Sequence, residues 1–441
     1  MWTNWSGGQR CRPVATARPL DEAGVAGVVR RAAERGQTVR PVGSGHSFSD
    51  LAVTDGVHLD ASAFSGITAV SAGGPGSGQA TVRVRAGTTV GELQEALAER
   101  GLALAVPLDL REPTVGGALA VGAHGSAAGH GSLSDQVLGM RIVDGRGEVR
   151  DVPRADLDAA RTALGALGVV LDVELAAVPA VPVRVTRSSR PLDEILDPAF
   201  WEGHDLAEAA LFPSSPTALA RWAEYVDPAE PVEEPGSEDE ADPKDARERT
   251  VGITSAGATG RTALGGAVVV ERALPRLAPS LNRVVSRLAR TVSATGAGHR
   301  VLSDPPAVRY EQTEWALPRE ALADGLRDLL TGLADGLETG LPIRMRVGPP
   351  EPGWLHPAHG RPTGWLAVRV PRGTDPGPVL DRASAVLRDH GGRPHWGTRH
   401  DFAPDDVAAA YPRLGDFLRV RDAYDPDRVF TNPALARVLG D

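Results

Sequence analysis

The sequence predicts an α+β fold divided between two domains, and three observations lead to that prediction. The chain has 441 residues, of which 41% are hydrophobic, so it can bury a sizeable core and is long enough for two domains. Helical and extended patterns separate into loose groups and lack the strict alternation of a doubly wound parallel sheet. No fixed-period internal repeat is present.

The first region, which should close near residue 180, combines helical and extended segments. A helix is expected over 19–36, opening at Asp21 and ending at a glycine. A short strand over 38–42 runs into a glycine-rich loop, and a second strand follows at 56–60. The other elements expected here are a hairpin turn at 73–78, a strand at 80–86, a helix at 90–100, paired strands at 137–144 and 148–152, and a strand at 169–173.

Three prolines, Pro179, Pro182 and Pro191, mark the passage into a second region over 181–441. Within it, the segment 227–250 holds ten acidic and three basic residues and few large apolar groups. Such a segment cannot offset the entropy lost on ordering, so we expect a mobile insertion. The other elements expected here are strands at 266–271, 308–316, 341–347 and 364–370, and helices at 278–292, 319–337 and 378–390.

Composition excludes several classes of protein and site. The formal charge is 47 − 57 = −10, which argues against a nucleic-acid partner. Cys11 is the only cysteine, which excludes an internal disulfide, a thiolate zinc site and an iron–sulfur cluster. No apolar run reaches the length of about 20 residues that spans a bilayer, and the amino terminus lacks the apolar core of a signal peptide. We therefore expect a cytoplasmic protein with no membrane span.

Two glycine-rich segments are candidates for binding a cofactor. The loop 43–48, Gly-Ser-Gly-His-Ser-Phe, begins like a dinucleotide fingerprint, but Phe48 stands where the third glycine belongs, so a Rossmann site is excluded. Its two glycines still allow backbone N–H groups to converge on a pyrophosphate. The segment 115–126 carries small side chains, and a large flat group could lie on its backbone. Tight packing of a buried loop would give the same pattern.

The histidines give no metal signature. His46, His124, His395 and His400 are widely separated and lack the local spacing with carboxylates that a metal site needs, so no metal is expected. A single histidine is more often structural than catalytic, and each needs independent support.

Five segments together supply that support. They occur in order over nearly the whole chain, and they closely resemble segments of the sugar-lactone oxidases. This family includes gulonolactone, arabinonolactone and alditol oxidases and belongs to the vanillyl-alcohol oxidase flavoprotein superfamily. The segments are VRPVGSGHSFSDLAVTDGVHLD, VGGALAVGAHGS, GALGVV, PHWGTRHDF and RDAYDPDRVFTNPALARVLG.

The resemblance implies a particular form of the α+β fold. Residues 1–180 would form an FAD-binding domain made of two small α+β subdomains. Residues 181–441 would form a substrate or cap domain with a large antiparallel sheet flanked by helices. The segment from about 401 to 441 would return to the FAD domain.

The resemblance also implies that FAD is the cofactor and that His46 is bonded covalently to it. No cysteine is available for the second, thiol-mediated attachment known in the superfamily. In relatives a small residue beside the ring gates oxygen, and Gly117 and Ala118 are the candidates here. The residues expected to contact the cofactor are Pro41, Val42, Gly43, Ser44, Gly45, His46, Ser47, Phe48, Gly116, Gly117, Ala118, Val121, Gly122, His124, Gly125, Ser126, Gly168, Val169, Val170 and His400.

The implied reaction oxidises a hydroxyl of a sugar-derived small molecule, an aldonolactone, an alditol or a sugar acid. The substrate carbon gives a hydride to flavin N5, and the protein supplies orientation and charge stabilisation. Dioxygen would then reoxidise the flavin and yield hydrogen peroxide. Two alternatives stay open: a dehydrogenase that uses another electron acceptor, and a flavin-binding protein with lost or altered catalysis.

The substrate pocket departs from the family pattern. Relatives carry a Glu and an Arg two residues apart on one strand, a His on the next strand and a Lys after Trp-Gly. Here Arg344 stands at the glutamate position, Arg346 matches the arginine, Arg369 replaces the histidine and Thr398 replaces the lysine. With His395, which would face the ring, these are the expected catalytic residues.

The replaced residues change the charge expected in the pocket. Residues two apart on a strand point to one face, so Arg344 and Arg346 should project together, and Arg369 would complete a cationic cluster. Such arginines require carboxylates or a bound anion, and Glu314 is one possible internal partner. We expect an anionic substrate, such as a sugar acid. Alternatively, the register differs and some of the arginines face solvent.

Overall fold

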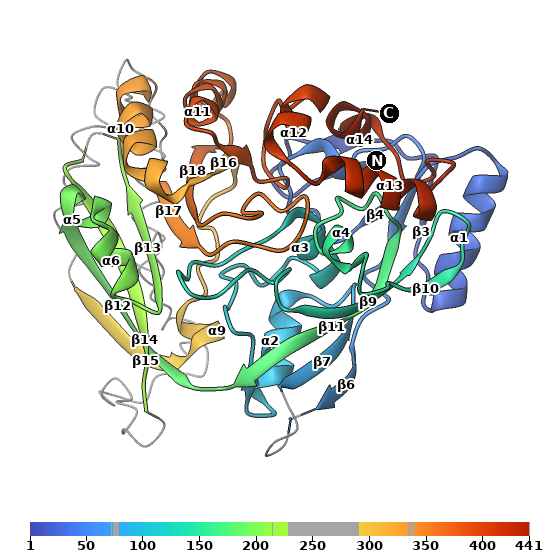
Figure 1. The fold of residues 1–441 in the computed structure, drawn as a ribbon, viewed down its shortest axis with the longest axis horizontal. Coiled ribbons are helices and arrows are strands. Elements are labelled where there is room, and N and C mark those ends of the chain that lie inside the picture. The colour runs from blue at the N-terminus through green and yellow to red at the C-terminus, as the bar shows by residue number, and fades with distance from the viewer. Residues whose placement is uncertain are drawn as a thin grey trace.

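The computed structural model describes residues 1–71, 73, 79–213, 215–227, 291–333, 337, 339 and 341–440. Figure 1 shows two halves side by side, with the large sheet on the left and the smaller sheets on the right. The segments expected at 73–78, 227–250, 266–271 and 278–292 lie wholly or mostly outside the described residues. Among the described helices, none has the length and apolar character needed to cross a membrane.

The amino-terminal half contains a three-stranded parallel sheet, ordered β3-β5-β4, and a six-stranded antiparallel sheet along β10-β9-β11-β7-β6, with β8 added on β11. A short β1-β2 pair precedes both. The strands are β1 (Trp2–Thr3), β2 (Arg10–Cys11), β3 (Ala15–Ala17), β4 (Val39–Val42), β5 (Val57–Asp60), β6 (Ile67–Ser71), β7 (Ala80–Arg85), β8 (Leu102–Ala103), β9 (Val137–Val143), β10 (Val149–Asp151) and β11 (Val169–Pro179). The helices are α1 (Glu22–Glu34), the 3-10 turn η1 (Asp50–Ala52), α2 (Val90–Ala98), α3 (Val115–Val121) and α4 (Leu157–Ala160).

Local sequence signals explain the two longer helices of this half. The side chain of Asp21 accepts the N–H of Gly24 at the start of α1, and the valines of that helix are buried against β4 and β5. Helix α2 begins with a capping box, in which Thr89 and Glu92 bond to each other's backbone N–H. Both elements match the expected ranges closely.

The chain passes to the second sheet between β11 and β12, because β11 ends at Pro179 and β12 begins at Pro182. The second sheet is antiparallel, ordered β15-β12-β14-β13-β17-β18-β16-β19. Its strands are β12 (Pro182–Pro191), β13 (Leu206–Leu211), β14 (Thr217–Tyr225), β15 (Val292–Ala297), β16 (Tyr310–Pro318), β17 (Ile343–Gly348), β18 (Thr363–Pro371) and β19 (Arg393–Pro394). The helices of this half are α5 (Leu192–Leu196), α6 (Pro198–Glu202), α9 (Gly298–Val301), η4 (Arg319–Ala321), α10 (Leu322–Leu333) and α11 (Gly377–Asp389).

The two faces of β17 and β18 have different neighbours. Helices α10 and α11 lie together against β16 and β18 (Figure 1). On the other face Arg344, Arg346 and Ala367 line a cavity shared with the amino-terminal half. In the register of the two strands Arg344 lies opposite Ala367, and Arg346 lies opposite Trp365.

The carboxyl-terminal helices α12 (Pro404–Ala410), α13 (Leu414–Tyr424) and α14 (Pro433–Leu439) lie beside the amino-terminal half, in red against blue in Figure 1. Val429 and Phe430 belong to the same buried cluster as α1, β4 and β5. Arg40 on β4 ties these parts together, because its guanidinium donates to the carbonyl oxygens of Leu51, Leu164 and Phe430 at 2.9 to 3.0 Å. Burial lowers the pKa of Arg40 to about 10.

One prediction about local structure is wrong. The segment 115–126 was expected to be a loop, but its first seven residues form helix α3. Thr114 caps this helix by accepting the N–H of Gly117, and Gly122 ends it in the left-handed conformation at φ 72°. The small residues that suggested a loop instead allow close packing of a helix: a Cβ on Gly116 would lie 2.9 Å from the Cβ of Ala86.

Candidate flavin and substrate site

A cavity lies between the two halves of the molecule. It has an empty volume of about 1970 Å³, counting its open mouth. The amino-terminal half contributes mainly backbone and small side chains, and the carboxyl-terminal half contributes long polar side chains. The two kinds of wall suit different ligands.

The loop 43–48 forms one wall. Gly45 has φ +71°, a conformation that favours glycine, and its carbonyl oxygen accepts the N–H of Trp5 at 2.8 Å. A Cβ on Gly43 would lie 2.1 Å from Oγ1 of Thr114, so this loop and the start of α3 touch without room for a side chain. The amino-terminal segment thus holds the loop against the helix and leaves its backbone facing the cavity.

His46 projects into this cavity without a hydrogen-bond partner among the described residues. Its ring stacks on Trp5, with ring centroids 5.6 Å apart. Burial lowers the pKa of His46, an effect that Glu112 partly opposes, so the imidazole is neutral near pH 7. A neutral ring nitrogen is the nucleophilic form that a covalent bond to a cofactor requires.

The structure brings most of the expected cofactor residues to one cavity. The ones that line it are Pro41, Val42, Gly43, Ser44, Gly45, His46, Ser47, Phe48, Gly116, Gly117, Ala118, Val121, His124, Gly168, Val169 and Val170.

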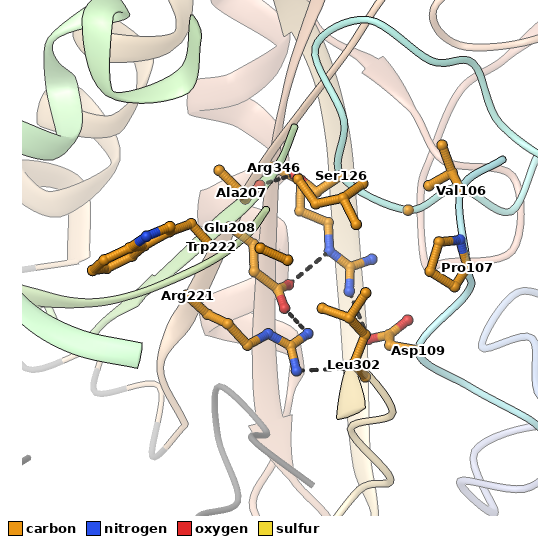
Figure 2. Close-up of a pocket in the computed structure, with 13 residues that line it drawn as sticks. Val106, Pro107, Asp109, Ser126, Ala207, Glu208, Arg221, Trp222, Leu302 and Arg346 are labelled. Carbon is orange, nitrogen blue, oxygen red and sulfur yellow. Dashed lines mark hydrogen bonds and ion pairs between the residues drawn. The ribbon is translucent and has the colours of Figure 1, made fainter. Parts of the chain in front are cut away.

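Four expected cofactor residues lie elsewhere. Gly125 and Ser126 line a smaller adjoining pocket (Figure 2), and Gly122 lies against the ring of His356. His400 lines a separate cavity with an empty volume of about 1080 Å³, together with Asp50 and Arg437, and it does not line the cofactor cavity. The place of His400 in the sequence, shortly after Trp396, did not reveal which cavity its side chain would line.

The shape and chemistry of the amino-terminal wall fit FAD. Backbone of loop 43–48 and of α3 lies open because its glycines carry no Cβ, as a pyrophosphate and a flat ring require. A Cβ on Gly117 would meet only its own capping residue, Thr114, within 4 Å. These two segments and His46 are therefore the residues that would hold the cofactor.

Arg344 and Arg346 project together from β17, as the strand geometry predicts, and both meet buried carboxylates. Arg344 lies 2.8 Å from Asp109 Oδ2 and 2.5 Å from Glu208 Oε2. Arg346 lies 2.6 Å from Asp109 Oδ2 and 3.1 Å from Glu208 Oε2. Arg221 pairs with the other oxygen of Glu208 (Figure 2). Internal carboxylates are thus counterions of these arginines.

The ion pairs fix the charge states of this network. Burial would raise the pKa of Asp109, but Arg346 and Arg344 outweigh it and hold that pKa far below its usual value. Burial would likewise raise the pKa of Glu208, and Arg221, Arg344 and Arg346 outweigh it. Asp109 and Glu208 are therefore both ionised at neutral pH.

Asp109, Glu208 and Arg221 were not among the expected site residues. Glu208 stands in the strand Leu206–Leu211, which is buried throughout, and a single acid in such a strand signals a buried partner. Asp109 lies in a loop with no such signal. The proposed internal partner, Glu314, instead lies 3.4 Å from Nε2 of His124.

Arg369 and Thr398 have structural contacts. The guanidinium of Arg369 donates to the carbonyl oxygen of Pro342 at 3.1 Å and lies over the ring of Tyr310 at 5.4 Å. Burial lowers the pKa of Arg369. Thr398 lines the cavity, and its Oγ1 accepts the N–H of Glu314 at 3.0 Å. Arg369 is not among the residues that line the cavity. In the register of the two strands it lies beyond the first residue of β17, outside the paired region.

His124, Glu314 and His395 form a buried group at the cavity wall, with their nearest nitrogen and oxygen atoms within 4.8 Å of one another. Nδ1 of His124 lies 2.9 Å from the carbonyl oxygen of Gly125, so it is the donor, and Nε2 faces Glu314. Trp365 stacks on His124 at 3.7 Å. Burial lowers the pKa of His395 to about 4, and its Nδ1 accepts the N–H of Gly397. His395 is therefore a neutral residue held by backbone.

Comparison with known proteins places this architecture in context. The profile of the family described as D-arabinono-1,4-lactone oxidase matches residues 173–438, and a profile described as FAD binding domain matches residues 13–153. L-gulono-1,4-lactone dehydrogenase of Mycobacterium tuberculosis is 32% identical, with the alignment covering 100% of this chain and 99% of the relative. L-gulonolactone oxidase of Mus musculus is 27% identical over 100% of this chain and 98% of the relative. Alditol oxidase of a Streptomyces strain is 28% identical over 99% and 98%.

The fold has solved counterparts. The crystal structure of cholesterol oxidase from B. sterolicum superposes with a TM-score of 0.76 at 21% identity, covering 99% of this chain and 96% of that one. This likeness confirms the expected α+β fold of the vanillyl-alcohol oxidase type. Together with the matched profiles and the glycine-lined cavity, it establishes that this chain is an FAD-dependent oxidoreductase that belongs to the D-arabinono-1,4-lactone oxidase family.

Proposed function

We propose that this enzyme oxidises a hydroxyl group of a sugar-derived compound, such as an aldonolactone or an alditol, with FAD bonded to His46. One observation carries the proposal. A wall of open glycine backbone faces, across one cavity, a wall of ordered polar side chains. The first wall carries His46, to which no described residue makes a hydrogen bond. FAD, when bound, supplies the hydride acceptor.

The polar wall explains how a sugar would be oriented. Arg346 and Asp109 offer hydrogen-bonding groups held by ion pairs, so their positions cost little ordering entropy when a substrate binds. Arg344 supports both of them, and Thr398 and His395 fix the neighbouring backbone. In this proposal Arg346 touches the substrate, while Arg344, His395 and Thr398 are positioning residues and Arg369 is structural.

The relatives' names support the substrate class, since they are called gulonolactone, arabinonolactone and alditol enzymes. We propose dioxygen as the electron acceptor, with hydrogen peroxide as product, in a cytoplasmic enzyme. A second acceptor is a competing candidate, because the relative with 32% identity is called a dehydrogenase.

The test begins with purified protein produced with ample riboflavin. We expect the acid-precipitated protein to stay yellow and the His46→Ala variant to release its flavin into the supernatant. A wild-type supernatant that carries all the colour would contradict the covalent bond and leave FAD dependence intact.

The second step is anaerobic mixing with a panel of alditols, aldonolactones and aldonic acids while flavin absorbance is followed. Rapid bleaching by an uncharged member is expected. Peroxide yield after readmission of air, compared with reduction of an artificial dye, separates oxidase from dehydrogenase. A flavin that no compound in the panel reduces would overturn the proposed function in favour of a flavin-binding protein without turnover.

A further inference from the structure

We propose that Asp109 determines substrate charge: one oxygen of its carboxylate holds the two cavity arginines, and the other accepts a hydrogen bond from a substrate hydroxyl. The site would then select uncharged polyhydroxy compounds and reject sugar acids. This inference rests on the proposed function and reverses the anionic substrate expected from the sequence.

The two oxygens of Asp109 have different surroundings. Both ion pairs to the arginines converge on Oδ2, at 2.8 Å from Arg344 and 2.6 Å from Arg346. Within the described chain, no residue donates a hydrogen bond to Oδ1. Oδ1 is also not one of the fully buried polar atoms that lack a hydrogen-bond partner, so its surface is accessible. Asp109 lines both the large cavity and the pocket of Figure 2. Its Oδ1 is therefore an acceptor open to a ligand.

The arginines are not open to an anion in the same way. Each guanidinium already touches two carboxylates, Asp109 and Glu208, and Nε of Arg344 is sealed from the cavity. A substrate carboxylate would have to displace Asp109 or approach its Oδ1, and like charges repel strongly in a buried site. A hydroxyl instead donates to Oδ1 in a charge-assisted hydrogen bond.

A purely structural Asp109 predicts something different. If the carboxylate served only to neutralise the arginines, its loss would strengthen the binding of acids and leave the affinity for neutral ligands unchanged. If its Oδ1 also accepts a hydrogen bond from a substrate hydroxyl, its loss should in addition weaken neutral ligands. The affinity for the neutral ligand therefore separates the two roles.

The experiment measures dissociation constants with holoenzyme, from the change in flavin absorbance, for an alditol and the aldonate of the same chain length. Binding is followed anaerobically, and the initial spectral change is separated from reduction by stopped flow. The variant is Asp109→Asn. The matched control is Asp172→Asn, because Asp172 also pairs with two arginines, Arg83 and Arg141, and lies on the amino-terminal sheet away from the cavity. Its side chain is 6% exposed, against 12% for Asp109.

In the wild-type protein we expect the alditol to bind at least about tenfold more tightly than the aldonate. Asp109→Asn should weaken the alditol by about tenfold and strengthen the aldonate, since two arginines then lack one counterion. Asp172→Asn should leave the ratio unchanged. An unchanged alditol affinity in Asp109→Asn, or an equal loss for both ligands, would overturn the inference.

A second variant covers the case in which Asp109→Asn does not fold. Asp109→Glu keeps the charge but moves the oxygens, so it should still reject the aldonate while binding the alditol more weakly. An aldonate that binds the Glu variant as well as the alditol does would overturn the inference. If the aldonate reduced the wild-type flavin fastest, that result would also overturn the inference but would leave the proposed function standing. If no compound reduced the flavin, the inference and the proposed function would both be overturned.

Discussion

The two walls of the cavity are built in opposite ways. The amino-terminal wall is open backbone, made of glycine segments that lie close together because side chains are missing. The opposite wall is made of long charged side chains, each held by partners far away in the sequence. The first wall depends on local conformation and the second on long-range charge balance. A general cofactor can thus be held by one wall while the other changes with the substrate.

The largest effect should come from breaking the charged wall. Glu208→Gln removes the carboxylate shared by Arg221, Arg344 and Arg346, leaving buried guanidiniums with too few counterions. We expect the free energy of unfolding to fall by about 3 kcal/mol. Urea unfolding followed by tryptophan fluorescence measures it.

The comparison for this change is Glu174→Gln. Glu174 also pairs with an arginine, Arg83, but its side chain is 34% exposed, so the loss there should stay below about 1 kcal/mol. Equal losses at both positions would show that burial of the network does not matter to stability.

A smaller effect is expected from the backbone wall. Gly43→Ala would place a Cβ 2.1 Å from Oγ1 of Thr114, which forces loop 43–48 away from α3. We expect strain of about 1–3 kcal/mol and a lower flavin-to-protein ratio, measured from the absorbance of purified protein. Gly129→Ala is the control, because nothing lies within 4 Å of a Cβ there. Full flavin loading of Gly43→Ala would show that the close approach of loop and helix is not needed.

The smallest effect concerns a carboxyl group outside both walls. Glu351 accepts the N–H of Ser132 at 2.5 Å, and its other oxygen is buried without a hydrogen-bond partner among the described residues. Burial raises the pKa of Glu351 to about 7, helped by Asp135 and opposed by Arg161. In the unfolded chain the same group ionises near 4.5. Between pH 4.5 and pH 7 this carboxyl group binds fewer protons in the unfolded chain than in the folded protein. The free energy of unfolding therefore falls as pH rises from 4.5 to 7, and this decline stops above pH 7.

Glu351→Gln should remove that decline. Between pH 5 and pH 8 we expect the variant to lose about 2 kcal/mol less stability than the wild type, as measured by urea midpoints at both values. Glu34→Gln, at an exposed position on α1, should behave as the wild type does. Parallel pH profiles for wild type and Glu351→Gln would contradict the raised pKa.

The difference between the walls also explains what could be predicted from the sequence. The cap of α1 at Asp21, the glycines of loop 43–48 and the alternation that aligns Arg344 with Arg346 are local signals, and each prediction agreed with the structure. Helix α3 was missed because small residues fit a loop and a closely packed helix equally well. The partners Asp109 and Glu208 lie 237 and 138 residues from Arg346, and one sequence does not reveal which strands become neighbours. For that reason the sequence predicted the arginines of the pocket but not the carboxylates that neutralise them.

Arg40 gives the polypeptide a fixed order of completion. One of the four carbonyl oxygens that accept from its buried guanidinium belongs to Phe430, 390 residues further along the sequence. During synthesis the glycine loop next to Arg40 therefore emerges from the ribosome long before Phe430 is made. We expect a nascent amino-terminal half to remain incompletely folded until Phe430 has emerged, and vitamin-derived cofactor to be captured only then.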